Sequence, residues 1–135
     1  MSNRFANNVS VYTVDATSGA LTQVTGSPFA AGSDPRSAAV DTSGHFLYVG
    51  NTVSNDISAY IVNSNTGALT PMQGSPFATG QVPLSLEMDG MGKIIYVANN
   101  ASNDVWVYAI DGASGKLQPV QTISTPGPFS IALLE

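Results

Sequence analysis

The chain repeats itself every 48 residues, and this period constrains the fold more than any other feature of the sequence. Residues 7–12, 55–60 and 103–108 resemble one another, and each segment follows the previous one by 48 positions. Residues 7–54 and 55–102 share 22 identical positions of 48 without a gap. A period of this length is typical of stacked copies of one structural unit. We therefore divide the single domain 1–135 into units 7–54, 55–102 and an incomplete unit 103–135.

Each unit contains four short apolar segments separated by turn residues. In the middle unit these are residues 57–62, 68–72, 84–88 and 93–98, which are rich in β-branched and aromatic side chains. Such residues favour strands, whereas the Gly, Asn and Pro residues between them favour turns. We expect residues 74–80 to form a long loop. No long window has a helical period, so the sequence predicts an all-β chain.

Four strands in a repeat of this length are typical of a β-propeller blade. A small sheet cannot bury both faces alone, but blades that stack face to face cover one another. This explains why residues 46–49 and 94–97 are apolar throughout instead of alternating. It also explains why only 10% of residues are charged, against roughly 25% in typical domains. We predict four-stranded antiparallel blades, about three of them in the chain.

One string of residues carries a family resemblance. The pattern Pro-x-Ser-x-x-x-Asp-x-x-Gly-x-x-x-Tyr-Val-x-Asn occurs at residues 35–51 and again at residues 83–99. It resembles the repeats of the lactonase-like propellers, which include 6-phosphogluconolactonase-like and YVTN-repeat proteins. The resemblance implies a propeller of about seven blades, lactone hydrolysis and a ligand in the central channel.

Closure of the ring is the main problem for a chain with three blades. The pattern gives eleven strands, beginning with two outer strands and ending with an innermost strand at residues 129–134. Propellers close with about four to eight blades, and an open arc would expose apolar blade faces. We therefore expect a homodimer with six blades, in which residues 129–134 of one copy join residues 9–14 of the other. The alternative is a piece cut from a longer propeller, in which residues 134 and 135 would come from cloning.

The charges and the missing cysteines exclude several classes of function. Four basic residues stand against nine acidic ones, so we expect no nucleic-acid partner. No cysteine is present and His45 is the only histidine, so we expect no metal site and no cofactor. No apolar run reaches the length of a membrane helix, so we expect no membrane partner. The compartment stays open, although a composition rich in Ser, Thr and Asn and poor in Lys slightly favours an extracytoplasmic origin.

Most polar residues of the repeat have a structural explanation. Asp15, Asp41, Asp89 and Asp111 stand beside Gly or Ser, where a carboxylate stabilises a turn by accepting backbone hydrogen bonds. The spacing is too sparse for a calcium loop. The tyrosines that recur at 48-residue intervals are expected to pack between blades. His45 is expected in an exposed turn.

The residues that break the repeat are the better candidates for a site. Arg36, Asp34 and Glu87 occupy positions that are uncharged in the aligned unit, so the blade itself does not require their charge. Arg36 and Asp34 are candidates to bind a ligand at the channel, and Glu87 is a candidate catalytic residue. The alternative is that these charges are solvated residues at the mouth of the channel. Trp106 replaces a serine of the other units, and it would either line a ligand pocket or fill an imperfect junction.

Two functions follow from these observations. The first is a propeller scaffold or binding module that self-assembles without catalysis. The alternative is a lactonase-like hydrolase whose channel site is assembled in trans, with water activated by Glu87. A hydrolase needs an acid or base beside a group that binds the electrophile. The scaffold requires fewer assumptions, because fold alone does not establish an activity.

Overall fold

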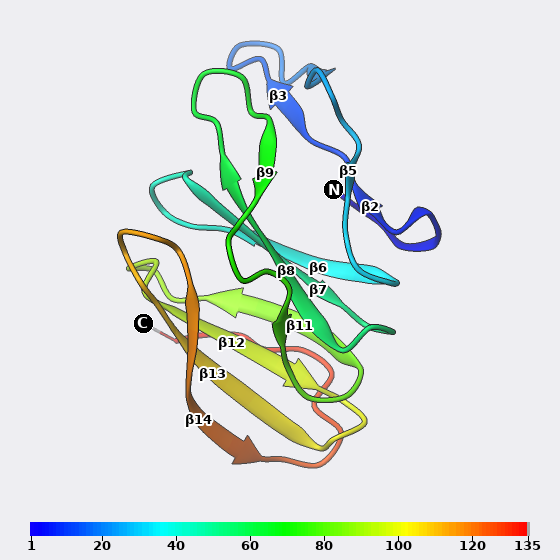
Figure 1. The fold of residues 1–135 in the computed structure, drawn as a ribbon, viewed down its shortest axis with the longest axis vertical. Coiled ribbons are helices and arrows are strands. Elements are labelled where there is room, and N and C mark those ends of the chain that lie inside the picture. The colour runs from blue at the N-terminus through cyan, green and yellow to red at the C-terminus, as the bar shows by residue number, and fades with distance from the viewer. Residues whose placement is uncertain (135) are drawn as a thin grey trace.

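The computed structural model describes residues 1–134, and strands are almost the only regular structure among them. A single turn of 3-10 helix, η1 (Arg4–Ala6), is the exception. The strands form four sheets, and by their order along the chain we group them into blades 1, 2 and 3, with two of the sheets in blade 1 (Figure 1). The all-β prediction of antiparallel blades is therefore confirmed.

Blade 3 is a complete four-stranded meander. It contains β11 (Pro83–Met88), β12 (Ile94–Asn99), β13 (Asp104–Ile110) and β14 (Leu117–Ser124), paired in this order. β11 is the innermost strand of the blade and β14 is the outermost. All neighbouring strands are antiparallel, as hairpin connections require.

Blade 2 has the same plan, but its outermost strand is divided. It contains β6 (Pro35–Val40), β7 (Phe46–Asn51) and β8 (Asp56–Val62), followed by β9 (Leu69–Pro71) and β10 (Phe77–Ala78). Both short strands pair with β8, and Phe77 lies opposite Ile57. The prediction of a loop over residues 74–80 was therefore wrong for β10. Blade 3 is three residues shorter in this region, and there the two pieces merge into β14.

Blade 1 contains only the outer part of the plan. Its strands are β1 (Ser2–Asn3), β2 (Asn8–Val9), β3 (Tyr12–Val14), β4 (Leu21–Gln23) and β5 (Phe29–Ala30). β1 corresponds to the end of β7 and β12 in the repeat, and among residues 1–134 it has no innermost strand beside it. Blade 1 is thus covered by blade 2 on one face and open at its inner edge.

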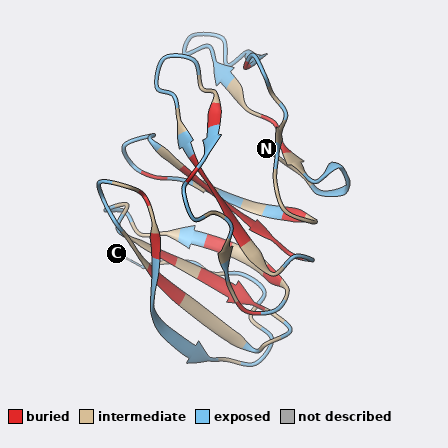
Figure 2. Cartoon of the chain, viewed as in Figure 1, coloured by how far each residue is buried: buried red, intermediate tan, exposed pale blue. Residues whose placement is uncertain are grey.

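The core lies between the blades. Tyr48, Ile57, Ile95 and Val97 are completely buried and form one cluster between blades 2 and 3. Figure 2 shows this buried zone along β7, β8, β12 and β13. Three of the five repeated tyrosines, Tyr48, Tyr60 and Tyr108, are buried in the core as the sequence predicted, and the Tyr48 hydroxyl donates to the Gly115 carbonyl oxygen at 2.6 Å. Burial raises the pKa of Tyr48 well above its ordinary value, so the hydroxyl keeps its proton.

The turn aspartates have the role that the sequence predicted. The Asp15 carboxylate accepts the backbone N–H groups of Thr17 and Ser18, and the Asp111 carboxylate accepts those of Ala113 and Ser114. Hydrogen bonds from Ser18 and Ser114 hold the pKa values of Asp15 and Asp111 below the ordinary value. Asp41 and Asp89 accept equivalent bonds in the hairpins of blades 2 and 3.

The expected innermost strand at residues 129–134 is absent from this structure. The chain after β14 has no strand pairing between residues 125 and 134. An isolated segment cannot satisfy its ladder hydrogen bonds, and no neighbouring strand is available to it within one copy. The prediction of this strand was wrong for the isolated chain, for which the structure has fourteen strands between residues 1 and 134 instead of eleven.

Candidate functional site

The two arginines of the chain converge on one carboxylate. Arg4 Nε donates to Asp34 Oδ1 at 2.5 Å, and Arg36 Nε donates to Asp34 Oδ2 at 3.2 Å. We call these three residues the arginine cluster. The Asp34 side chain is 13% exposed, while those of Arg4 and Arg36 are 49% and 31% exposed. One carboxylate and two guanidinium groups leave the cluster with a net positive charge in an otherwise acidic chain.

The connection between blades 1 and 2 places the cluster. Asn7 accepts the Asp34 N–H through its side-chain oxygen at 2.9 Å, which fixes the main chain just before β6. Asp34 has a φ of 58°, a left-handed conformation that Asp tolerates better than most residues. Arg4 comes from η1 in the β1–β2 connection, and Arg36 is the second residue of β6. The arginine cluster therefore forms where the β1–β2 connection, the connection that precedes β6 and the first residues of β6 lie together.

The cluster is confined to the first of the repeated connections. At the next connection Thr52 stands in place of Arg4 and donates its hydroxyl to the Pro83 carbonyl oxygen at 2.9 Å. Val82 and Leu84 replace Asp34 and Arg36 there. The fold therefore forms the connection without these charges.

The charges around Asp34 keep it ionised. Partial burial alone would raise its pKa, but the hydrogen bonds and positive charges of Arg4 and Arg36 outweigh this, and the pKa is lowered overall. Among residues 1–134, the Arg36 side chain has no hydrogen bond other than that to Asp34. The Nη groups of Arg36 are therefore available to an acceptor from outside.

Sequence reasoning selected Asp34 and Arg36 but missed Arg4. The same departure from the repeat that selected Asp34 and Arg36 also applies to Arg4, because Arg4 aligns with the uncharged residues Thr52 and Asn100. Arg4 lies before residue 7, where the first full unit begins. Its guanidinium also lies 5.1 Å from the ring centre of Phe5. A shallow hollow of about 360 Å³ is lined by Arg4, Phe5, Asn7, Ser33, Asp34 and Val53, and Arg36 lies outside it.

Glu87 is not part of the arginine cluster. It is an exposed residue near the end of β11, the innermost strand of blade 3. Arg36 aligns with Leu84, so Glu87 belongs to the next blade and stands three positions further along the repeat. Among the described residues the Glu87 carboxylate has no hydrogen-bond partner. It is therefore a carboxylate without a hydrogen-bond partner on β11, the innermost strand of the blade that follows β6.

Trp106 lies in the packing between blades 2 and 3. Its ring is half-buried against that core and lies 6.1 Å from the ring of Tyr108. The aligned Ser58 accepts hydrogen bonds from Gly32 N and Asn51 Nδ2 instead. The Trp106 Nε1 atom is buried without a partner in the described part of the chain. The position corresponds to the second of the two roles considered for Trp106, filling a junction.

The remaining polar groups do not form a metal site. His45 is exposed in the β6–β7 turn, and its Nδ1 lies 2.9 Å from the Ser43 hydroxyl. Residues 1–134 contain no group of three His, Cys, Asp or Glu side chains placed to hold a metal ion. The same residues include no helix long and apolar enough to cross a membrane.

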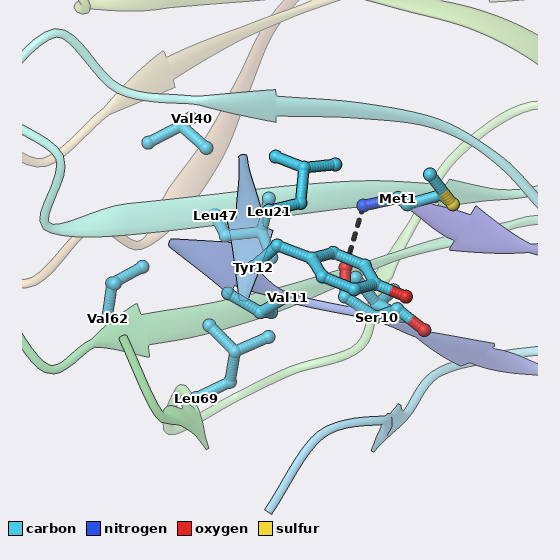
Figure 3. A pocket seen from close by; sticks show the side chains of 10 residues that line it. Met1, Ser10, Val11, Tyr12, Leu21, Val40, Leu47, Val62 and Leu69 are labelled. Carbon is cyan, nitrogen blue, oxygen red and sulfur yellow. Dashed lines mark hydrogen bonds between the residues drawn. The ribbon is translucent and has the colours of Figure 1, made fainter. Parts of the chain in front are cut away.

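An apolar pocket lies between blades 1 and 2 (Figure 3). Its volume is about 250 Å³, and it is lined mainly by aliphatic side chains. They come from both blades and include Val9, Val11, Val40, Leu47 and Leu69. A pocket with so few polar groups has little to orient a reacting substrate.

A family model described as "Lactonase, 7-bladed beta-propeller" matches residues 1–77 and 74–133. A search of curated proteins gave no significant match. The family match covers most of the chain and confirms the family that the repeated sequence pattern indicated.

Solved structures agree on the fold. A protein from Bacteroides fragilis, named as a candidate 6-phosphogluconolactonase, superposes with a TM-score of 0.89 at 20% identity over 98% of this chain and 37% of its own. A protein from Lactobacillus plantarum gives 0.83 at 25% identity over 98% and 40%. The periplasmic gluconolactonase PpgL of Pseudomonas aeruginosa gives 0.80 at 20% identity over 93% and 36%. The chain thus spans less than half the length of these proteins.

Proposed function

The chain belongs to the lactonase family of seven-bladed β-propellers, and on this premise we propose that it forms part of a lactone hydrolase with the arginine cluster as its substrate site. This reading replaces the non-catalytic scaffold as the preferred function, because the match is to a family of lactonases. The names of two structural neighbours, a candidate 6-phosphogluconolactonase and a gluconolactonase, point to sugar lactones as the substrates to try first.

The observation that carries the proposal is the convergence of Arg4 and Arg36 on Asp34. Both arginines depart from the repeat, and the other connections are formed without them. Because the fold does not require these charges, a ligand explains them better than packing does. Arg36 stands at the start of an innermost strand, and the innermost strands of a propeller line its central channel.

The chemistry assigns separate tasks to the charged residues. In lactone hydrolysis, water adds to the ring carbonyl carbon, the ring C–O bond breaks, and a proton reaches the ring oxygen that leaves. Negative charge develops on the carbonyl oxygen, and preorganised donors stabilise it. The Nη groups of Arg36 supply such donors. Asp34 holds both guanidinium groups in place and acts as a positioning residue.

Water activation falls to Glu87 in this scheme. Asp34 is a poor base, because two guanidinium groups lower its pKa. The Glu87 carboxylate has no such partner among residues 1–134, so it can accept a proton from water. Arg36 and Glu87 stand on the innermost strands of blades 2 and 3, the strands that line the channel of a propeller.

The test is hydrolysis of glucono-δ-lactone and of its 6-phosphate ester, followed as acid release in a pH-stat and corrected for spontaneous opening. We expect Arg36→Gln and Glu87→Gln each to lower kcat/KM at least about tenfold, the low end of what general acid–base and oxyanion groups contribute. The matched control is Lys93→Gln, which removes an exposed cation from a hairpin turn and should leave the rate unchanged. Absence of turnover, or equal rates in Arg36→Gln and the control, would return the chain to the scaffold reading.

A further inference from the structure

A second cavity, which we call the junction cavity, lies between blades 2 and 3 and has a volume of about 460 Å³. The arginine cluster lies at the beginning of β6, whereas the junction cavity opens beside the β6–β7 turn that follows the other end of this strand. Figure 1 shows the β6–β7 and β13–β14 turns on the same side of the arc. The junction cavity is therefore separate from the site proposed above.

Tight packing holds the two walls of the junction cavity in place. The hydrogen bond from the Tyr48 hydroxyl to the Gly115 carbonyl oxygen ties the β13–β14 turn to blade 2. A Cβ atom at Gly115 would come within 2.5 Å of both Met72 Cε and Phe46 Cδ1, so this turn lies directly on the blade 2 wall. Lys116 follows Gly115 and is thereby fixed at the edge of the cavity.

Lys116 brings a positive charge to the junction cavity. It is half-buried, and its Nζ donates to Gln73 Oε1 at 3.3 Å. Among residues 1–134 it forms no ion pair. Asp111 belongs to the same turn, but its carboxylate accepts the N–H groups of Ala113 and Ser114 and the Ser114 hydroxyl. The ammonium group of Lys116 therefore keeps donors for an acceptor from outside.

The repeat does not require this polar pair. At the junction of blades 1 and 2, Ala68 stands in place of Lys116 and Thr25 in place of Gln73. The fold forms that junction without a cation at the β8–β9 turn. Lys116 is thus unmatched in the repeat in the same way as Arg36.

His45 supplies an acceptor to the same cavity. Burial alone would raise the pKa of Asp41, but hydrogen bonds from Ser43 and from the main chain outweigh it and lower the pKa, so this carboxylate only accepts. Ser43 donates its single hydroxyl proton to Asp41 Oδ2, and it can then only accept from His45 Nδ1, 2.9 Å away. The neutral His45 ring therefore carries its proton on Nδ1 and presents Nε2 as an acceptor. Within the described part of the chain, Nε2 has no partner.

The rest of the blade 2 wall is mainly apolar. It contains Phe46, Ile61 and Met72, of which Met72 is buried in the core and Ile61 is 46% exposed. Aromatic rings pack well on a phenylalanine ring and on a methionine thioether. A cavity with apolar walls and a few polar groups binds its ligand on the walls and orients it through the polar groups.

We propose that the junction cavity binds a small aromatic hydroxy acid. Its carboxylate accepts from Lys116 Nζ, its ring packs on Phe46 and Met72, and its hydroxyl donates to His45 Nε2. The proposal concerns binding alone. It requires neither turnover nor the arginine cluster, so it holds even if the chain hydrolyses no lactone.

Four probes with the same ring separate the two polar contacts. They are 3-hydroxybenzoate, 4-hydroxybenzoate, benzoate and phenol, each titrated at pH 8 into the isotope-labelled chain and followed by amide NMR. We expect one hydroxybenzoate to shift the Gln73 side-chain amide and the main-chain amides of residues 112–116. It should bind at least about fivefold more tightly than benzoate or phenol, because each of these lacks one hydrogen bond. No saturable shift at these amides, or equal affinity for benzoate, would overturn the proposal.

Variants assign each contact to its residue. His45→Phe keeps a ring and should abolish the preference for the hydroxybenzoate over benzoate. Lys116→Gln should abolish the preference over phenol and weaken hydroxybenzoate binding at least about tenfold, because it removes a charged donor. The matched control is Lys93→Gln, which removes a cation at the position equivalent to His45 in blade 3 and should leave the affinity unchanged. Arg36→Gln should leave it unchanged as well. Equal weakening in Lys93→Gln would mean attraction by net charge, and loss of binding in Arg36→Gln would place the ligand at the arginine cluster; either result overturns the proposal.

Discussion

The two junctions between blades differ in one side chain that the repeat places at their centre. Between blades 2 and 3, Tyr48 is completely buried, and its hydroxyl bonds to Gly115 O. The equivalent residue between blades 1 and 2 would lie immediately before Met1. The structure has the apolar pocket of Figure 3 at this junction.

Several residues around the two positions correspond in the repeat. Residues that line the pocket align with members or neighbours of the buried cluster that contains Tyr48: Val9 with Ile57, Val11 with Ala59, Val40 with Met88, Leu47 with Ile95, and Leu69 with Leu117. Val40 is 55% exposed at the incomplete junction. The pocket therefore corresponds to the place that Tyr48 fills at the other junction, and the difference shows how much of a junction depends on one aromatic residue.

The largest effect is expected at the complete junction. Tyr48→Ala should lower the free energy of unfolding by about 3–5 kcal/mol, as in other large aromatic-to-alanine changes in a core. Tyr48→Phe keeps the ring and removes the hydrogen bond, so it should cost about 1 kcal/mol. Urea denaturation measures both. Tyr12→Ala is the control, because Tyr12 lines the open pocket and packs less completely. Equal losses at Tyr48 and Tyr12 would contradict the comparison.

The opposite change should repair the incomplete junction. An extension that copies residues 91–96 in front of Met1 places a tyrosine where the pocket is. Burial of one large apolar side chain contributes about 1.5–3 kcal/mol, so the free energy of unfolding should rise by about 2 kcal/mol. The control extension ends in serine instead of tyrosine. If the two extensions stabilise the chain equally, the pocket is not a tyrosine site.

Much of this comparison was available from the sequence. The 48-residue period placed Tyr48 between blades, assigned Asp15 and Asp111 to turns, and predicted the apolar strand β7, because strict repetition fixes which side chains face a neighbouring blade. It could not predict β10, because Phe77 follows two turn residues, and its pairing with Ile57 depends on tertiary contact.

The candidate site was less predictable. Asp34 and Arg36 were found because they break the repeat, but their meeting with Arg4 depends on two connections that come together only in the folded chain. A charge that is unmatched in the repeat indicates a position where the blade itself does not require that charge. It does not indicate which other charge lies beside it.

The smallest effect concerns the backbone of the two connections. Asp34 and Val82 occupy equivalent left-handed positions with φ values of 58° and 57°, but valine is β-branched and disfavours this region more strongly. Relief of strain of about 1–2 kcal/mol, less the entropy that glycine loses on folding, should leave Val82→Gly about 0.5–1 kcal/mol more stable. Val40→Gly is the control, because Val40 lies within the strand β6 and should lose stability instead. Thermal unfolding of both variants measures the difference. Destabilisation of Val82→Gly to the same extent as Val40→Gly would mean that the valine side chain contributes more to its junction by packing than its backbone costs in strain.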